Sequence, residues 1–135
     1  MFLLGVFIMS ISDINRALAG AFTLSPISMT EWQIKNDATF QNGEELKIYL
    51  INEKNKWYLT DKKETLKYMN NMYDLKAPDV KNCIAAVIRI YGFSIKAGSL
   101  TGEVIDEVQL LNVIFNYIMC IGQLANMYAF FDKPE

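Results

Sequence analysis

Residues 108–131 read VQLLNVIFNYIMCIGQLANMYAFF, a run of 24 residues without a charged side chain. A helix of that length spans about 36 Å, which is enough to cross a bilayer. Unpaired amides are costly in lipid, however, and a helix that faces water normally carries lysine and glutamate. The run therefore predicts a helix that protein covers on nearly every side, in part from a second subunit. A helix would carry five of its amides on one face: Gln109, Asn112, Asn116, Gln123 and Asn126.

This helix also bears on the assembly of the protein. Its apolar faces and its amide stripe together exceed the surface that the core of one 135-residue chain should cover. We therefore predict a homodimer whose buried contacts come from the apolar residues of this helix. The candidate interface residues are Ile114, Tyr117, Ile118, Ile121 and Tyr128.

The composition indicates a single globular domain and narrows the classes of function. A chain of 135 residues is long enough for one core, and a hydrophobic content of 52% suits an additional buried surface. The net charge of −2 carries no overall signal for binding polyanions. The chain has no histidine, which removes the commonest general base and metal ligand. We therefore expect no metal and no cofactor.

The two cysteines, Cys83 and Cys120, each lie in an apolar helical pattern. Small buried thiols suit this pattern. We expect no disulfide between these two residues of separate helical patterns, and no zinc site, because a third soft ligand is missing. Free thiols are compatible with a reducing cytoplasm, where we expect the protein to act.

Residues 1–8, MFLLGVFI, form an apolar extension before the expected domain. The segment lacks the basic start and the small-residue cleavage site of a secretory signal. Translation begins either at Met1, with residues 1–8 forming a first strand or a helix extension, or at Met9. We place one domain at residues 9–135 and predict no membrane association.

The first half of the domain predicts a helix followed by a three-stranded antiparallel meander. Apolar residues at helical spacing indicate a helix over residues 11–22, and Pro26 would end it. Period-two alternation then indicates three strands, over residues 27–35, 46–51 and 57–59.

Turn and capping signals connect these elements to the next helix. Asn42-Gly43 predicts a type I′ hairpin turn, and Glu53-Lys54-Asn55 marks a second turn. Asp61 and Glu64 have capping-box spacing. A helix is therefore predicted to begin there and to run through Tyr73.

The second half predicts two further helices with a hairpin between them. Pro78 suits the first position of a helix, and Gly92 lies just beyond its end. Residues 93–105 contain two glycine turns that suit a short hairpin, and Asp106 with Gln109 would open the final helix. The predicted order is α-βββ-α-α-ββ-α. We therefore expect a single α+β domain, an antiparallel meander plus a short hairpin with helices packed on it.

Residues 40–66 combine four short motifs. They are the turn Phe40-Gln41-Asn42-Gly43, the strand Leu46-Lys47-Ile48-Tyr49-Leu50, the step Tyr58-Leu59-Thr60-Asp61 and the helix start Thr65-Leu66. This order resembles DUF1828, a domain of unknown function in bacteria and phages. The helix that ends at Tyr91-Gly92 and the apolar C-terminal helix are similar too. The resemblance implies an α+β fold and a phage or prophage setting, and it assigns no activity.

The chain departs from this family after Leu59-Thr60-Asp61. Family members tend to have a glycine there, whereas this chain has Lys62 and Lys63. Any role of that glycine in a tight turn or in the approach of a ligand is therefore open here.

The order of the elements is also similar to that of small acidic type III secretion chaperones, which dimerise through helices. This likeness rests on architecture alone. It implies an alternative function, a chaperone-like dimer that holds an unfolded segment of a partner.

Two groups of residues are candidates for a functional site. Asp61 is either a helix cap or a catalytic or ligand-binding carboxylate. A basic and aromatic patch is the second candidate, and it suits single-stranded nucleic acid, an acidic protein surface or an ordinary solvated hairpin. Its residues are Lys54, Lys56, Trp57, Tyr58, Lys62 and Lys63.

From these features we predict a non-enzymatic protein of phage or mobile-element type that binds a macromolecular partner as a homodimer. A protein partner is favoured over nucleic acid, and inhibition of a host defence system would be one such role. The alternatives are the chaperone-like dimer and a hydrolase that uses Asp61. No catalytic residue is expected outside that last alternative.

Overall fold

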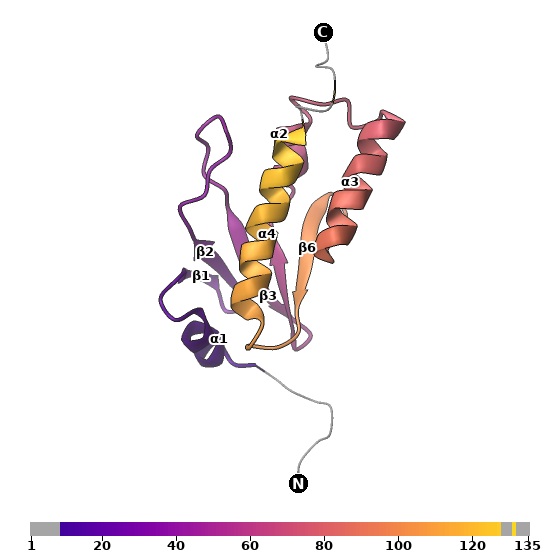
Figure 1. Cartoon of the computed structure of the whole chain (residues 1–135). Coiled ribbons are helices and arrows are strands. Elements are labelled where there is room, and N and C mark those ends of the chain that lie inside the picture. Colours follow the sequence, from indigo (N-terminus) through magenta and orange to yellow (C-terminus); the bar gives the residue numbers. More distant parts are fainter. Residues whose placement is uncertain (1–8, 128–130, 132–135) are drawn as a thin grey trace.

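The computed structural model describes residues 9–127 and Phe131, and it shows a six-stranded antiparallel sheet with helices packed on it (Figure 1). The strands are β1 (Thr23–Ser28), β2 (Glu31–Lys35), β3 (Ile48–Glu53), β4 (Lys56–Thr60), β5 (Ser94–Lys96) and β6 (Ser99–Val104). The helices are α1 (Ile11–Leu18), α2 (Glu64–Met69), α3 (Pro78–Tyr91) and α4 (Leu110–Ala125). The predicted α+β class is confirmed. The prediction for residues 1–8 lies outside the described residues.

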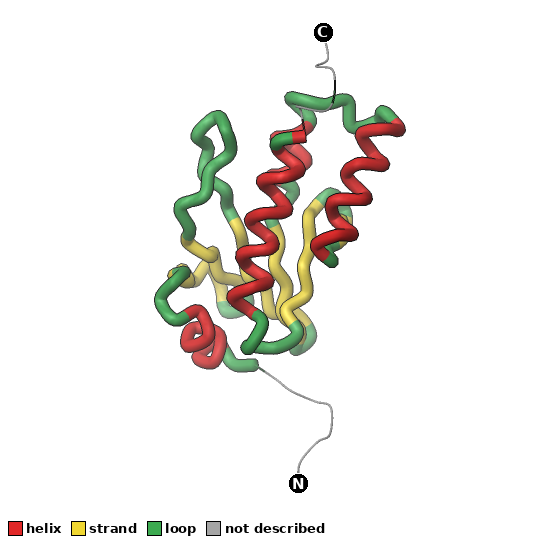
Figure 2. Tube along the Cα trace, in the orientation of Figure 1, coloured by secondary structure: helices red, strands yellow, loops and turns green. Residues whose placement is uncertain are grey.

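The predicted meander and hairpin form one continuous sheet of order β1-β2-β3-β4-β6-β5. The connection comes from β6, which pairs with β4 so that Trp57 lies opposite Val104 and Thr60 lies opposite Thr101. Helix α4 crosses one face of this sheet with α3 beside it, and α1 and α2 also contact α4 (Figure 2). The opposite face has no helix on it among the residues that the structure describes.

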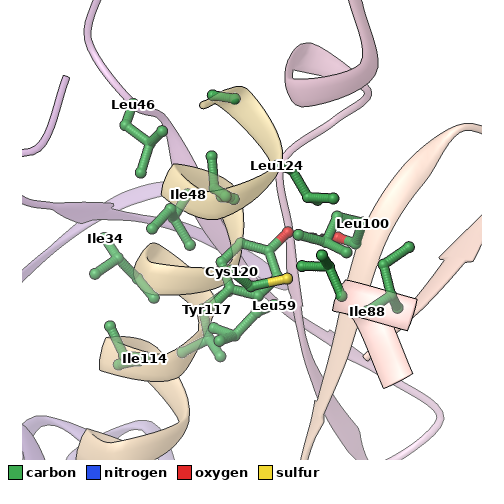
Figure 3. Packing of buried hydrophobic residues seen from close by; sticks show 14 of the residues in the cluster. Ile34, Leu46, Ile48, Leu59, Ile88, Leu100, Ile114, Tyr117, Cys120 and Leu124 are labelled. Atoms are coloured by element: carbon green, nitrogen blue, oxygen red, sulfur yellow. Dashed lines mark hydrogen bonds between the residues drawn. The ribbon is translucent and has the colours of Figure 1, made fainter. Parts of the chain in front are cut away.

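The core lies between α4 and the sheet (Figure 3). The buried side of α4 repeats at spacings of three and four residues, as expected for one face of a helix. These residues pack on the inward side chains of the strands, among them Ile34, Ile48, Leu59 and Leu100. Each fully buried aliphatic side chain contributes about 1.5–3 kcal/mol relative to exposure. The buried residues of α4 are Leu110, Ile114, Tyr117, Cys120, Ile121, Leu124 and Ala125.

The N-terminal region differs from the prediction in two ways. The helix ends at Leu18 instead of residue 22, because Ala19 adopts a left-handed conformation with φ of 50°. Pro26 lies within an additional strand, β1, which the weak alternation of the sequence did not reveal. Proline is tolerated there because β1 is an edge strand, with only β2 beside it.

The predicted type I′ turn at Asn42-Gly43 is wrong. The chain does reverse there, since the Gly43 N–H donates to the Phe40 carbonyl at 2.9 Å. A type I′ turn centred on Asn42-Gly43 needs positive φ at both residues, however, and only Gly43 has it, with φ of 87°. Two-residue hairpin turns with both φ positive occur instead at Lys54–Asn55 (53° and 63°), between β3 and β4, and at Ala97–Gly98 (51° and 84°), between β5 and β6.

The signals of the second half locate α3 and the hairpin, but the opening of the final helix predicted at Asp106 and Gln109 is too early, because α4 begins at Leu110. Helix α3 begins at Pro78, and Gly92 ends it in the left-handed region with φ of 78°. The predicted hairpin is present as β5 and β6. The final helix is shorter than the uncharged run, because α4 covers only 16 residues, or about 24 Å. Within the described ranges no helix is long and apolar enough to cross a membrane.

Candidate functional site

Asp61 is buried, with 1% of its surface exposed, where β4 leads toward α2. Its Oδ1 accepts hydrogen bonds from the backbone N–H of Lys63 at 3.1 Å and of Leu100 at 3.0 Å. Its Oδ2 accepts from the backbone N–H of Thr65 at 3.0 Å. One carboxylate therefore ties the first turn of α2 to strand β6. This geometry favours a structural role, because both oxygens have donors within the chain.

The capping-box prediction at Asp61 and Glu64 places the helix start too early. Helix α2 begins at Glu64, and the residue in the N-cap position is Lys63. The helix cannot start sooner because Lys62 and Lys63 have φ of 52° and 72°, in the left-handed region. Glycine adopts this conformation more readily than lysine does.

Tyr117 lies beside this junction, at the centre of the core. Its hydroxyl donates to the carbonyl of Leu100, the residue whose N–H donates to Asp61. Burial raises the pKa of the phenol well above its ordinary value, and the negative charge of Asp61 adds to the effect. Tyr117 therefore stays neutral at any physiological pH and holds β6 against α4.

Cys120 gives a pH-dependent prediction, because burial raises the pKa of its thiol from 9.0 to about 12. The unfolded chain ionises this thiol first, so the corresponding stability is complete below pH 9.0 and is lost as the pH rises toward 12. We expect Cys120→Ala to flatten the fall of the unfolding free energy over this range, as measured by urea titrations. Cys83→Ala, which removes the other thiol of the chain, is the matched control. Identical slopes for the wild type and Cys120→Ala would contradict the assignment.

The structure divides the predicted basic and aromatic patch. Trp57 is wrong as a surface residue, because only 3% of it is exposed, its Nε1 donates to the Met9 carbonyl at 3.0 Å and it packs on Trp32. Alternation along β4 directs Trp57 into the core and Tyr58 to the opposite face. Lys56 and Lys63 are exposed.

Lys62 is held in place on the open face of the sheet. Its ammonium pairs with the carboxylate of Glu31 and lies 4.1 Å from the centroid of the Tyr49 ring. These contacts satisfy the charge of Lys62 within the chain. The lysine is therefore less available to a partner than its position in the sequence predicts.

A shallow hollow of about 340 Å³ lies on the open face of the sheet. It brings together Lys54 and Tyr58 from the predicted patch with residues that the sequence analysis missed, notably Lys96. Neither Lys54 nor Lys96 forms an ion pair with another described residue. The pairing of β4 with β6 assembles this site, and no local signal reveals that pairing. The lining residues are Ile51, Glu53, Lys54, Tyr58, Thr60, Lys96 and Thr101.

The outer face of α4 is a second candidate surface. The five predicted amides do share one face, but within the described residues the protein cover predicted for this face is absent, since all five are exposed. Two large apolar side chains lie among the amides, Phe115 at 48% exposure and Met119 at 58%. The face therefore has amide and apolar side chains and no charge.

The predicted interface residues are mostly wrong. Ile114, Tyr117 and Ile121 are at most 1% exposed, because they face the sheet of their own chain. Ile118 is partly exposed at the flank of α4. Tyr128 lies outside the described residues. A partner could contact α4 only through its opposite face.

Both thiols are free in this structure. The described ranges contain no group of three or more histidine, cysteine, aspartate or glutamate residues arranged to hold a metal ion. The geometry thus draws attention to the two surfaces, the hollow on the sheet and the outer face of α4.

No protein-family model, curated protein or solved structure matches the chain. The likeness to DUF1828, the phage setting and the likeness to secretion chaperones therefore stay predictions.

Proposed function

We propose that the protein acts without catalysis, by binding a partner protein through the open face of its sheet, and that it works as a homodimer through the outer face of α4. The observation that carries the proposal is the hollow between Lys54 and Lys96, two cations without an ion pair among the described residues. The ring of Tyr58 and the side chain of Ile51 give the hollow an apolar floor. Such a site suits a protein loop with an apolar side chain between acidic residues.

The polar groups of the hollow also favour an acidic partner. Thr60 Oγ1 accepts a hydrogen bond from the Lys62 N–H, which leaves its hydroxyl hydrogen to donate to a ligand. The two lysines and this hydroxyl make the hollow rich in donors, against a single carboxylate at Glu53. An acidic protein surface would satisfy them better than a basic one.

Two further parts of the proposal rest on the family resemblance and on the geometry around Asp61. The resemblance to DUF1828 supports a phage or mobile-element setting, in which the partner would be a host protein, for instance a component of a defence system. The three N–H donors around Asp61 support a structural carboxylate in place of a hydrolytic one. Binding, and not bond cleavage, is therefore the proposed activity.

Charge reversal tests the sheet face. We expect Lys54→Glu/Lys96→Glu to weaken the partner complex at least tenfold at low salt, mostly through slower association, with a smaller effect at high salt. Captures from a lysate of the source cells, treated with nuclease and quantified by mass spectrometry, would identify proteins retained by the wild type and lost from the variant. Titration of the purified partner then gives the affinities.

Lys76→Glu/Lys81→Glu is the matched control, because both lysines are exposed and lie outside the hollow. This variant has the same net charge and should retain the partner. Equal losses of partner binding in both variants would show that the effect comes from net charge alone. Unchanged capture by Lys54→Glu/Lys96→Glu would contradict the proposed protein-binding face. The same conclusion would follow if the wild type retained only nucleic acid from a lysate that had not been treated with nuclease.

A further inference from the structure

The outer face of α4 has two different flanks on either side of Met119. At about 100° per residue, Phe115, Ile118 and Gly122 fall on one flank, whereas the amides Asn112, Asn116 and Gln123 fall on the other. The first flank borders a groove of about 290 Å³ that Ile118, Gly122 and Phe40 help to line. On the second flank, Gln123 Oε1 accepts a hydrogen bond from the Tyr91 hydroxyl of α3 at 3.0 Å.

The first flank has a protrusion and a depression one above the other. Phe115 packs on Phe22 of its own chain, with the ring centroids 5.3 Å apart, and still has 48% of its surface exposed. Gly122 lies seven residues further on, about 10.5 Å along the same flank. A Cβ atom at Gly122 would meet no atom within 4 Å, so the space above this glycine is open. The aromatic ring of another molecule could occupy it.

From this pattern we propose that α4 packs against α4 of a second copy of the chain, antiparallel, with the two-fold axis at Met119. The inference rests on the proposed homodimer and specifies its interface. A two-fold axis of this kind places Phe115 of each protomer at Gly122 of its partner. It also sets Asn116 beside Gln123 of the partner, so that amide meets amide.

The absence of charge on α4 favours a second copy over a different protein. Side chains near a two-fold axis meet their own copies, so a charge there would be repelled by an equal charge. A helix without charge between residues 110 and 125 avoids this repulsion completely. An interface with a different protein commonly uses complementary charges for orientation, and this face offers none.

A parallel pair fits the same face poorly. Rotation about an axis along the helix would set the apolar flank of one protomer against the amide flank of the other. It would also leave the space at Gly122 without a side chain to fill it. Only the antiparallel arrangement brings like flanks together and fills the depression with Phe115.

The arrangement has a consequence for the proposed function. In Figure 1 the outer face of α4 lies on the side of the sheet that carries the helices. Two copies joined through α4 would hold their helices inside and direct their open sheet faces outward. The dimer would therefore present two hollows and bind a repeated or dimeric partner with increased avidity.

Cysteine cross-linking in a Cys83→Ser background tests this geometry. Met119→Cys should form a disulfide-linked dimer under mild oxidation, because the two copies of residue 119 meet at the axis. Asn112→Cys alone and Asn126→Cys alone should not, because each residue would lie about 21 Å from its own copy, beyond the reach of a disulfide. A mixture of these two variants, one of them tagged, should give the mixed dimer.

Sedimentation provides the independent measurement of assembly. One helix from each protomer makes a small interface, so we expect a dimer that dissociates at micromolar concentrations. Met119→Lys would bring two positive charges together and should raise the dissociation constant at least tenfold. Asn71→Lys, which adds the same charge at an exposed position outside α4, should leave it unchanged.

The outcomes separate the inference from the proposed function. Cross-linking of all three single variants would establish a parallel pair, and a dimer by sedimentation without any cross-link would place the interface elsewhere. Either result overturns the antiparallel α4 contact and leaves the homodimer standing. A single 15.5 kDa species across the micromolar range would overturn the homodimer itself.

Discussion

Asp61→Ala is expected to lower the free energy of unfolding by about 4 kcal/mol, since it removes a buried carboxylate and leaves three backbone N–H groups without an acceptor. Asp61→Asn should lose about 2 kcal/mol, because its amide has one acceptor oxygen and sets an NH₂ group against an N–H donor. Urea unfolding followed by the fluorescence of Trp32 and Trp57 measures both changes.

The contrast between these variants is the informative part of the experiment. As a simple helix cap, asparagine would replace aspartate with little loss. Asp61→Asn with wild-type stability would therefore show that the bonds to Leu100 and to the helix are not both made. Asp37→Asn is the matched control, because Asp37 is exposed and its substitution should change stability by no more than about 0.5 kcal/mol.

Ile114→Ala is expected to lower the free energy of unfolding by about 3 kcal/mol, because it leaves a cavity between α4 and the sheet. Ile114 is fully buried within its own chain. The nearby Asn116→Ala, at an exposed position, should change stability by no more than about 0.5 kcal/mol. Urea unfolding at a concentration where the protein is monomeric gives both values.

This pair of variants also decides whether Ile114 of α4 packs in the core of its own chain or faces a partner in the dimer. If Ile114 faced a partner, Ile114→Ala would weaken the dimer and leave the stability of the monomer unchanged. That result would restore the interface predicted from the sequence. A large loss of monomer stability would instead show that Ile114 packs on the sheet of its own chain.

Local signals in the sequence predicted much of the fold. Proline at the start and glycine after the end located α3, because both act on the backbone within one turn. Alternation located the interior strands, since one side of each strand is buried. Strand β1 was not predicted because its residues are mostly exposed and show no clear alternation of apolar and polar side chains.

The candidate site was less predictable. Lys54 and Tyr58 stand out locally, but Lys96 lies more than thirty residues further along the chain and joins them only through the strand pairing. Trp57 was misplaced because its indole N–H is satisfied by the Met9 carbonyl, a contact between distant residues. A tryptophan beside lysines resembles a surface patch until such a partner is known.

By itself, the sequence determined the α+β class, the ends of α3 and the shared face of the α4 amides, because each depends on residues within a few turns of one another. Only the tertiary structure decided which side of α4 meets the sheet, since apolar residues occur all around that helix and periodicity alone does not choose between them. It likewise decided the hydrogen bonds of Asp61, because the N–H of Leu100 reaches that carboxylate only once β6 has paired with β4.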